Sequence, residues 1–172
     1  KLIEKGCSVT VLDNLSPQIP SDNSPLYNSI KDKVKFIKGT VLNYDDWKNA
    51  LENIEVVVHL AAETGTGQSM SEIEKYTDVN IKGTSIFLDI LANEKHSVKK
   101  MIIASSRSIY GEGKYSCSKD GIVYPNERKD TDMANGDFNV KCPICNENAK
   151  LLATDEISKN HPSSIYGITK QV

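Results

Sequence analysis

The apolar positions of this chain fall in short runs separated by longer polar or helix-periodic segments. Four runs predict strands, at Ser8–Leu12, Val34–Ile37, Glu55–Leu60 and Lys99–Ser105. The third run is almost wholly apolar, which is typical of a strand covered on both faces. Strands of this kind that alternate with helices predict an α/β fold with a parallel sheet.

Helical segments are predicted between these strands, at Lys1–Gly6 (a last turn closed by glycine), at Tyr44–Leu51, and from Ser69 to about Glu94. Asn43 is expected to be the N-cap of the second helix. The third has a broadly apolar face that Asn80 and Gly83 interrupt. The residues expected on this face are Met70, Ile73, Tyr76, Phe87, Ile90 and Leu91.

Two further segments are polar. Pro17 to Ser29 contains three prolines and predicts a surface loop. Arg107 to His161 is predicted to be irregular, and so long a loop is usually functional. Pro162 ends it, and Ser163 or Ser164 is expected to cap a helix that carries Tyr166 and Lys170.

Composition excludes several classes of protein. A length of 172 residues with 26% charged side chains suits one globular domain or part of a larger one. The net charge of −2 gives no electrostatic reason to expect nucleic acid or a membrane as partner. No apolar run approaches the roughly 20 residues of a membrane span. Lys1–Gly6 lacks the apolar core and cleavage site of a signal peptide, and an incomplete N-terminus is the alternative that leaves one open. Four cysteines without a dense framework favour a reducing, cytoplasmic setting.

The end of the chain carries candidate chemistry. Tyr166 and Lys170 are four residues apart, so they share one face of a helix. An ammonium beside a phenol favours the phenolate, which can then act as a base. Ser105 ends the fourth predicted strand, and Ser106 and Ser108 follow it. The ends of parallel strands are where α/β sheets bind ligands. The structural alternatives are an amphipathic surface helix and a serine-rich turn.

Five segments in this order resemble the extended short-chain dehydrogenase/reductase family, in particular its NAD-dependent nucleotide-sugar epimerases and dehydratases. They are Val11–Leu15, His59–Ala62, Asn80–Thr84, Ala104–Gly111 and Pro162–Lys170. The stretch around Ser105–Gly113, followed by a cysteine-bearing insertion, is similar to the subgroup that includes the dTDP-L-rhamnose 4-epimerases.

The resemblance implies a Rossmann-like doubly wound parallel sheet that is incomplete in this chain. Residues 1–172 would form a partial NAD-binding domain, with a polar Cys-containing insertion at about 112–160. The family's first strand and glycine-rich turn have no counterpart here, nor does its C-terminal substrate-binding part. In a 3-2-1-4-5 order, that first strand would lie between Val9–Leu12 and Val56–Leu60. We therefore expect a piece of a longer enzyme that would not catalyse unaided.

The resemblance also implies a set of NAD-binding residues. Asp13 would bind the adenosine ribose, which favours NAD over NADP, with help from Asn14; the alternative for Asp13 is a turn former. Other positions matching cofactor contacts are Thr40 (where the family usually has an aspartate), Val41, Leu60, Ala61, Ala62 and Asn80. Strand-end packing is the alternative for the Leu60–Ala62 segment, and a solvent-facing side chain is the alternative for Asn80.

The expected activity is nucleotide-sugar 4-epimerisation. Tyr166 would be the base, Ser106 would bind the substrate oxygen, and Lys170 would bind the nicotinamide ribose, with NAD carrying hydride. The alternative enzymes are a 4,6-dehydratase and a reductase. The 4,6-dehydratases usually carry Asp-Glu or Thr-Glu beside the catalytic serine, and Arg107 at that place counts against a dehydratase. Arg107 itself could bind a phosphate or sugar hydroxyl or be solvated, and His59 is expected to be a satisfied strand residue. The expected partners are a nucleotide sugar and, for the whole enzyme, a second copy of itself. The alternative to an enzyme is a non-catalytic module that binds a nucleotide or is held together by zinc.

The insertion contains Cys142-Pro-Ile-Cys145, which has the spacing of a zinc knuckle, and Cys117 with Asp120 three residues further on. Structural zinc held by three cysteines and an aspartate is one interpretation, and reduced loop thiols are the other. Cys7 is expected to be a packing residue.

Overall fold

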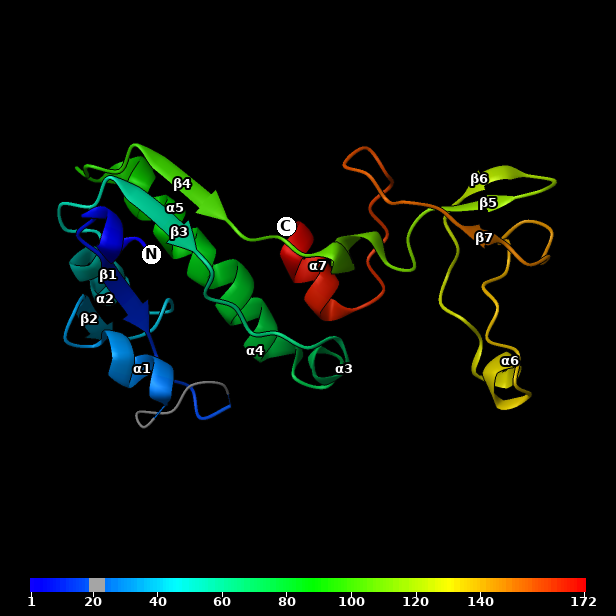
Figure 1. Cartoon of the computed structure of the whole chain (residues 1–172), viewed down its shortest axis with the longest axis horizontal. Coiled ribbons are helices and arrows are strands. Elements are labelled where there is room, and N and C mark those ends of the chain that lie inside the picture. The colour runs from blue at the N-terminus through cyan, green and yellow to red at the C-terminus, as the bar shows by residue number, and fades with distance from the viewer. Residues whose placement is uncertain (19–23) are drawn as a thin grey trace. The chain divides into compact units, whose positions relative to one another are not determined.

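The predicted strands form two parallel pairs in the computed structural model, which describes residues 1–18 and 24–172 (Figure 1). The first pair is β1 (Thr10–Asp13) with β2 (Lys35–Lys38). The second is β3 (Val56–His59) with β4 (Lys100–Ile103). The two pairs are not hydrogen bonded to each other in the described residues. The 3-2-1-4-5 strand order implied by the family resemblance places a further strand between β1 and β3.

The chain divides into two compact units. Lys1–Ala62 and Thr77–Ala104 form the first, which contains both parallel pairs. Glu63–Tyr76 and Ser105–Val172 form the second, which contains the cysteine-bearing segment and the last helix.

The core of the first unit lies where two helices, α2 (Tyr44–Ala50) and α5 (Gly83–Asn93), pack near the strands. Its buried residues are Val41, Trp47, Leu51, Phe87 and Ile90. The Trp47 and Phe87 rings stack with centroids 4.8 Å apart. The predicted cap is confirmed, since the side chain of Asn43 accepts a 3.0 Å hydrogen bond from the amide of Asp46.

The expectation that both faces of the third strand are covered is wrong for the described residues. Val57 and His59 face the core, but Val56 and Val58 are 52% and 49% exposed. All four residues of β4 are exposed as well. Side chains alternate along a strand, so one whole face of the β3–β4 pair lacks a covering layer within residues 1–18 and 24–172.

The long helical segment is present, but it is divided. It comprises α3 (Thr66–Ser69), α4 (Ile73–Thr77), a π-helical turn (Asp78–Lys82) and α5. Phe87 and Ile90 are buried as predicted, whereas Met70 and Ile73 are more than half exposed, which corrects the predicted apolar face. A π turn contains one residue more than an α turn, so the side chains after it are rotated around the helix axis relative to those before it. A single apolar face with a period of 3.6 residues therefore cannot continue along the whole segment.

In the N-terminal region, one prediction is confirmed and one is wrong in part. Ile3–Lys5 forms a 3₁₀ turn closed by Gly6 in the left-handed conformation, as predicted. The predicted loop of residues 17–29 is wrong at its end, because Pro25–Ile30 forms helix α1 with Ser24 as its N-cap. Ser24 as cap and Pro25 at the first helical position are a standard helix start. Residues 19–23 of that loop lie outside the described residues.

The segment predicted to be irregular contains a small antiparallel sheet in the order β6-β5-β7 (Figure 1). Its strands are β5 (Tyr115–Cys117), β6 (Gly121–Val123) and β7 (Lys150–Leu151). A 3₁₀ turn (Arg107–Tyr110), α6 (Asp130–Ala134) and α7 (Ile165–Gln171) complete the second unit. Strands of two or three residues are too short for a periodic signal in sequence. No helix in the described ranges is long and apolar enough to cross a membrane.

Candidate active site

Helix α7 carries Tyr166 and Lys170 one turn apart, and its start follows from local sequence. The hydroxyl of Ser164 accepts a 3.0 Å hydrogen bond from the amide of Gly167, so Ser164, one of the two predicted residues, is the N-cap. Gly167 lets the helix approach the loop after β4, because a Cβ there would lie 2.7 Å from the carbonyl oxygen of Ser108. The absence of a side chain at this position therefore brings the two candidate segments together.

The three candidate serines make different contacts. Ser105 donates its hydroxyl proton to the carbonyl oxygen of Lys170 at 3.0 Å and so ties the loop to α7. Ser106 accepts a 3.2 Å hydrogen bond from the amide of Ser108 and caps the 3₁₀ turn. A hydroxyl that accepts in this way keeps its own proton for another acceptor. Ser106 thus retains a donor, which Ser105 has already used.

A buried serine holds the backbone of Tyr166. The Ser69 hydroxyl accepts a 3.0 Å hydrogen bond from the Tyr166 amide and donates one of 2.6 Å to the carbonyl of Thr66. The Tyr166 ring also makes an edge contact with the ring of Tyr76, with centroids 6.4 Å apart. The start of α7 is therefore fixed by the segment 63–76 as well as by the loop after β4.

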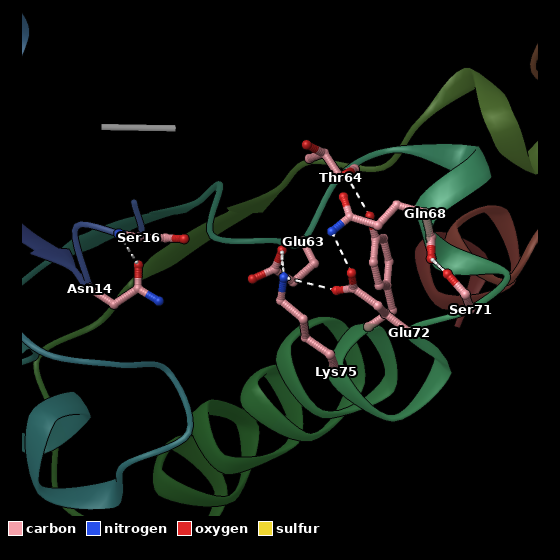
Figure 2. A network of polar contacts seen from close by, with 9 residues as sticks. Asn14, Ser16, Glu63, Thr64, Gln68, Ser71, Glu72 and Lys75 are labelled. Carbon is pink, nitrogen blue, oxygen red and sulfur yellow. Dashed lines mark hydrogen bonds and ion pairs between the residues drawn. The ribbon is translucent and has the colours of Figure 1, made fainter. Parts of the chain in front are cut away.

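A polar network stabilises that segment (Figure 2). Lys75 forms ion pairs of 3.2 Å with Glu63 and 3.1 Å with Glu72, and Gln68 donates to Glu72 at 2.8 Å. Hydrogen bonds from Gln68 and Lys75 lower the pKa of Glu72, and those to Glu72 and Glu63 raise the pKa of Lys75. Tyr76 donates to the carbonyl of Thr64 at 2.6 Å, and burial raises its pKa.

The ammonium of Lys170 is half-buried, and within residues 1–18 and 24–172 no carboxylate pairs with it. Burial lowers the pKa of Lys170 from its ordinary value. A buried cation without a counter-charge is unfavourable unless a ligand or another group compensates it. Lys170 is therefore available for a function other than structural ion pairing.

Apart from Tyr166 and Lys170, the predicted cofactor residues lie in the first unit, and all of these except Asn80 lie at or just after the ends of strands. One oxygen of Asp13, Oδ1, accepts from the amide of Leu15 at 2.8 Å, so Asp13 does form the turn of the alternative interpretation. Its Oδ2 has no hydrogen bond within the described ranges. Asn14 accepts from the amide of Ser16 in the same way. The hydroxyl of Thr40 accepts from the amide of Leu42, and its own amide donates to Asp46.

The remaining predicted positions differ in exposure. Leu60 and Ala61 are exposed after β3, and Ala62 is half-buried. The Val41 side chain lies in the core, and its carbonyl accepts from the Trp47 indole at 2.8 Å. Asn80 is buried in the π turn, so the solvent-facing alternative is wrong. His59 is buried and its Nε2 lies 3.1 Å from the Thr84 hydroxyl, which confirms it as a satisfied strand residue.

The structure also explains part of the Asn80–Thr84 motif by packing. A Cβ at Gly83 would lie 2.6 Å from Cγ2 of Val41. The Thr84 hydroxyl donates to the carbonyl of Asn80 at 2.8 Å. The motif thus combines a close helix contact with a buried polar group.

The cysteine-bearing segment brings four candidate ligands together. One ligand atom from each of Cys117, Asp120, Cys142 and Cys145 lies within 4.8 Å of all the others. Cys117 and Cys142 are buried, whereas Cys7 is exposed, which corrects its expected packing role. Hydrogen bonding to the Asp120 carboxylate raises the pKa of Cys145 to about 12.

A pocket of about 310 Å³ in the second unit is lined by Glu112, Asn126 and His161, among others. Ser106, Tyr166 and Lys170 are not among its lining residues. The candidate catalytic groups therefore do not share this pocket.

Parallel pairing of strands joined by helices, together with the ordered motifs, defines a Rossmann-like α/β fold. The chain matches the NAD dependent epimerase/dehydratase family over residues 1–129, and it belongs to that family. It is 31% identical to the dTDP-L-rhamnose 4-epimerase of Burkholderia thailandensis over 174 residues, which covers 99% of this chain and 46% of the relative. Over 81 residues it is 38% identical to the dTDP-D-glucose 4,6-dehydratase of Dictyostelium discoideum, covering 46% of this chain and 18% of that one.

Among solved structures, the chain is similar to a UDP-glucuronic acid 4-epimerase from Bacillus cereus in complex with UDP-glucuronic acid and NAD. The TM-score is 0.67 at 24% identity, covering 99% of this chain and 43% of the other. This likeness confirms the predicted Rossmann-like fold class. The chain spans less than half the length of the relatives it matches.

Two contributors to the candidate site were missed in the sequence. Ser69 was assigned only as a helix start, yet its hydroxyl holds the Tyr166 amide. Gly167 lies between the candidate base and lysine, and it permits the close contact with Ser108. A glycine within a helix costs stability relative to alanine, and that cost was the available signal.

Proposed function

We propose that this chain is the part of an NAD-dependent nucleotide-sugar 4-epimerase that supplies the catalytic proton-transfer groups. The observation that carries this proposal is the packing of α7 against the loop 105–110, through the Ser105–Lys170 hydrogen bond and the contact at Gly167. The resemblance of the whole chain to a 4-epimerase supports it.

NAD, when bound, would accept hydride from the sugar C4 and return it to the other face of the ring. The residues proposed to hold it are Asp13 at the ribose, the segment 60–62 after β3, and Lys170. Among the described residues, Asp13 Oδ2 has no hydrogen bond and no carboxylate pairs with the Lys170 ammonium, so the two offer the acceptor and the donor that ribose hydroxyls require. Asn14, Thr40, Val41 and Asn80 remain predicted contacts of the same cofactor.

In this proposal Tyr166 takes the proton from the sugar 4-hydroxyl and later returns it. Ser106 donates its remaining hydroxyl proton to the same substrate oxygen. Lys170 stabilises the phenolate of Tyr166 by charge, and the anion in turn supplies the counter-charge that Lys170 lacks. The sugar and the nucleotide base stay unassigned within the nucleotide-sugar class.

The test uses the full-length parent enzyme and a panel of dTDP- and UDP-sugars, with products identified by NMR. Tyr166→Phe should lower turnover by about 100-fold or more, the usual contribution of a positioned acid or base. Ser106→Ala should lower it more than Ser105→Ala, because Ser105 has committed its proton to the Lys170 carbonyl. Turnover of Tyr166→Phe within a few-fold of the parent would refute the assignment.

A 4,6-dehydratase is the second candidate, which the Dictyostelium relative favours. Arg107 beside Ser106 argues against it, because the dehydratase pattern has an acidic residue there. The same NMR experiment separates the two, since a dehydratase releases a 4-keto-6-deoxy sugar and an epimerase releases the C4 epimer. Homodimerisation of the parent is a further prediction, which light scattering would check.

A further inference from the structure

Two turns of the same kind face each other in the cysteine-bearing segment. The first is Cys117–Gly121 and the second is Cys142–Asn146. In each, two ligand-type residues stand three apart, and the residue after the second is left-handed, with φ of 74° at Gly121 and 62° at Asn146. The strand pairing of β5 with β6 holds the first turn in a hairpin. The repetition of one backbone turn is an observation independent of side-chain type.

Backbone amides already point at the sulfur atoms. The amide of Lys119 donates to Sγ of Cys117 and the amide of Ile144 donates to Sγ of Cys142, each at 3.4 Å. These donors would stabilise thiolates rather than thiols, because a charged acceptor strengthens a hydrogen bond. Both turns are therefore built to hold negatively charged sulfur.

Three of the six separations among the four ligand atoms are close to those of a tetrahedron around one ion, and all six are within 4.8 Å. Sγ of Cys117 lies 3.4 Å from Sγ of Cys145, and Oδ2 of Asp120 lies 3.3 Å and 3.2 Å from Sγ of Cys117 and Cys142. Zinc bonds of about 2.3 Å to sulfur and about 2.0 Å to oxygen place neighbouring ligands roughly 3.5–3.8 Å apart. Only small movements would be needed to admit an ion.

The segment also needs a stabilising element. Its buried cluster contains only Tyr115, Cys117, Val123 and Cys142, so two of its four members are cysteines. A core this small rarely holds a fold without a disulfide or a metal. The cysteines are free thiols, so no disulfide fills that role.

We propose that Cys117, Asp120, Cys142 and Cys145 bind one structural Zn²⁺ ion that closes the cysteine-bearing segment. Thiolate-rich tetrahedral sets select zinc among the divalent ions, and four protein ligands leave no position for a substrate, so the site is structural. Binding replaces the three thiol protons, which pass to solvent, by three zinc–sulfur bonds. The proposal does not depend on the proposed epimerase activity.

The test is a metal titration of the full chain, purified under reducing conditions and stripped with a chelator. Cobalt should bind one equivalent with the absorption of a tetrahedral thiolate site, and zinc should displace it. Cys142→Ser should weaken binding by more than about 100-fold, beyond the effect of losing an outer-shell partner. Cys7→Ser is the matched control, because Cys7 is exposed in the other unit, and it should bind as the parent does.

Variants of Asp120 test the same site without removing a buried cysteine. Asp120→Asn should weaken cobalt binding, and Asp120→Cys should restore tight binding with a stronger sulfur-to-cobalt absorption. Failure of the parent chain to bind cobalt, a Cys117–Cys145 disulfide in the reduced preparation, or equal weakening by Cys7→Ser and Cys142→Ser would each overturn the proposal. Sugar turnover plays no part in these readouts.

Discussion

Replacement of Gly167 by alanine tests the packing that brings the candidate catalytic segments together. The added methyl would lie 2.7 Å from the carbonyl oxygen of Ser108 and 3.0 Å from Cβ of Pro162. Both neighbours are stiff, one being backbone and the other a proline ring. Neither can move aside as the end of a flexible side chain could.

The expected magnitude is the difference of two effects. Overpacking of a tight contact costs about 1–3 kcal/mol, and glycine to alanine within a helix contributes up to about 1 kcal/mol in the opposite direction. Because the neighbours cannot yield, we expect the upper part of the first range and a net loss of about 1–2 kcal/mol. That loss corresponds to roughly 5- to 30-fold in the equilibrium between docked and undocked α7.

Hydrogen exchange followed by mass spectrometry on peptides covering α7 measures this equilibrium locally. Gly67→Ala is the matched control, because Gly67 also lies in a helix of the second unit and a Cβ there meets nothing within 4 Å. It should leave exchange of α7 unchanged. Exchange of α7 that is as slow in Gly167→Ala as in the parent would refute the argument that this glycine is required by packing.

Three further predictions concern stability. Phe87→Ala should lower the free energy of unfolding by about 3–5 kcal/mol and Leu88→Ala by much less, since Phe87 is fully buried and Leu88 is 42% exposed. Urea unfolding monitored by Trp47 fluorescence measures both losses, and equal losses would contradict the assigned core. Asn43→Ala removes an N-cap and should lower the free energy of unfolding by about 0.5–2 kcal/mol in the same assay. An unchanged urea midpoint would contradict the role of Asn43 as a cap. Burial lowers the pKa of Lys170, so the folded chain binds fewer protons than the unfolded chain between that lowered pKa and 10.5. Stability measured by circular dichroism should rise with pH in this window, and Lys170→Met should remove the rise; an identical rise in the variant would contradict it.

Local signals in the sequence were sufficient for most elements. β-branched runs predicted four strands that the structure contains, with ends that differ from the predicted ones by one or two residues. Capping residues such as Asn43 and Ser164 marked helix starts correctly, because a cap depends only on a side chain and an amide three residues on. Helix α1 was missed because Pro25 and the neighbouring Ser24 and Ser29 also suit a loop.

Contacts between residues far apart in the chain could not be predicted from local sequence patterns. The role of Ser69 depends on a bond to Tyr166, 97 residues away, and no periodic pattern encodes such a contact. The same limit hid the antiparallel pairing of β5 with β7, whose strands are too short to show alternation.

The sequence alone determined that Tyr166 and Lys170 lie on one face of α7, because residues four apart in a helix are neighbours on its surface. It also determined the cysteine spacing within each turn. Only the tertiary structure decided which serine keeps its proton and that two cysteine turns 25 residues apart converge, Cys117 and Cys142 being their first members. The physical reason is that hydrogen-bond donors and metal ligands act over a few ångströms, and chain folding sets those separations.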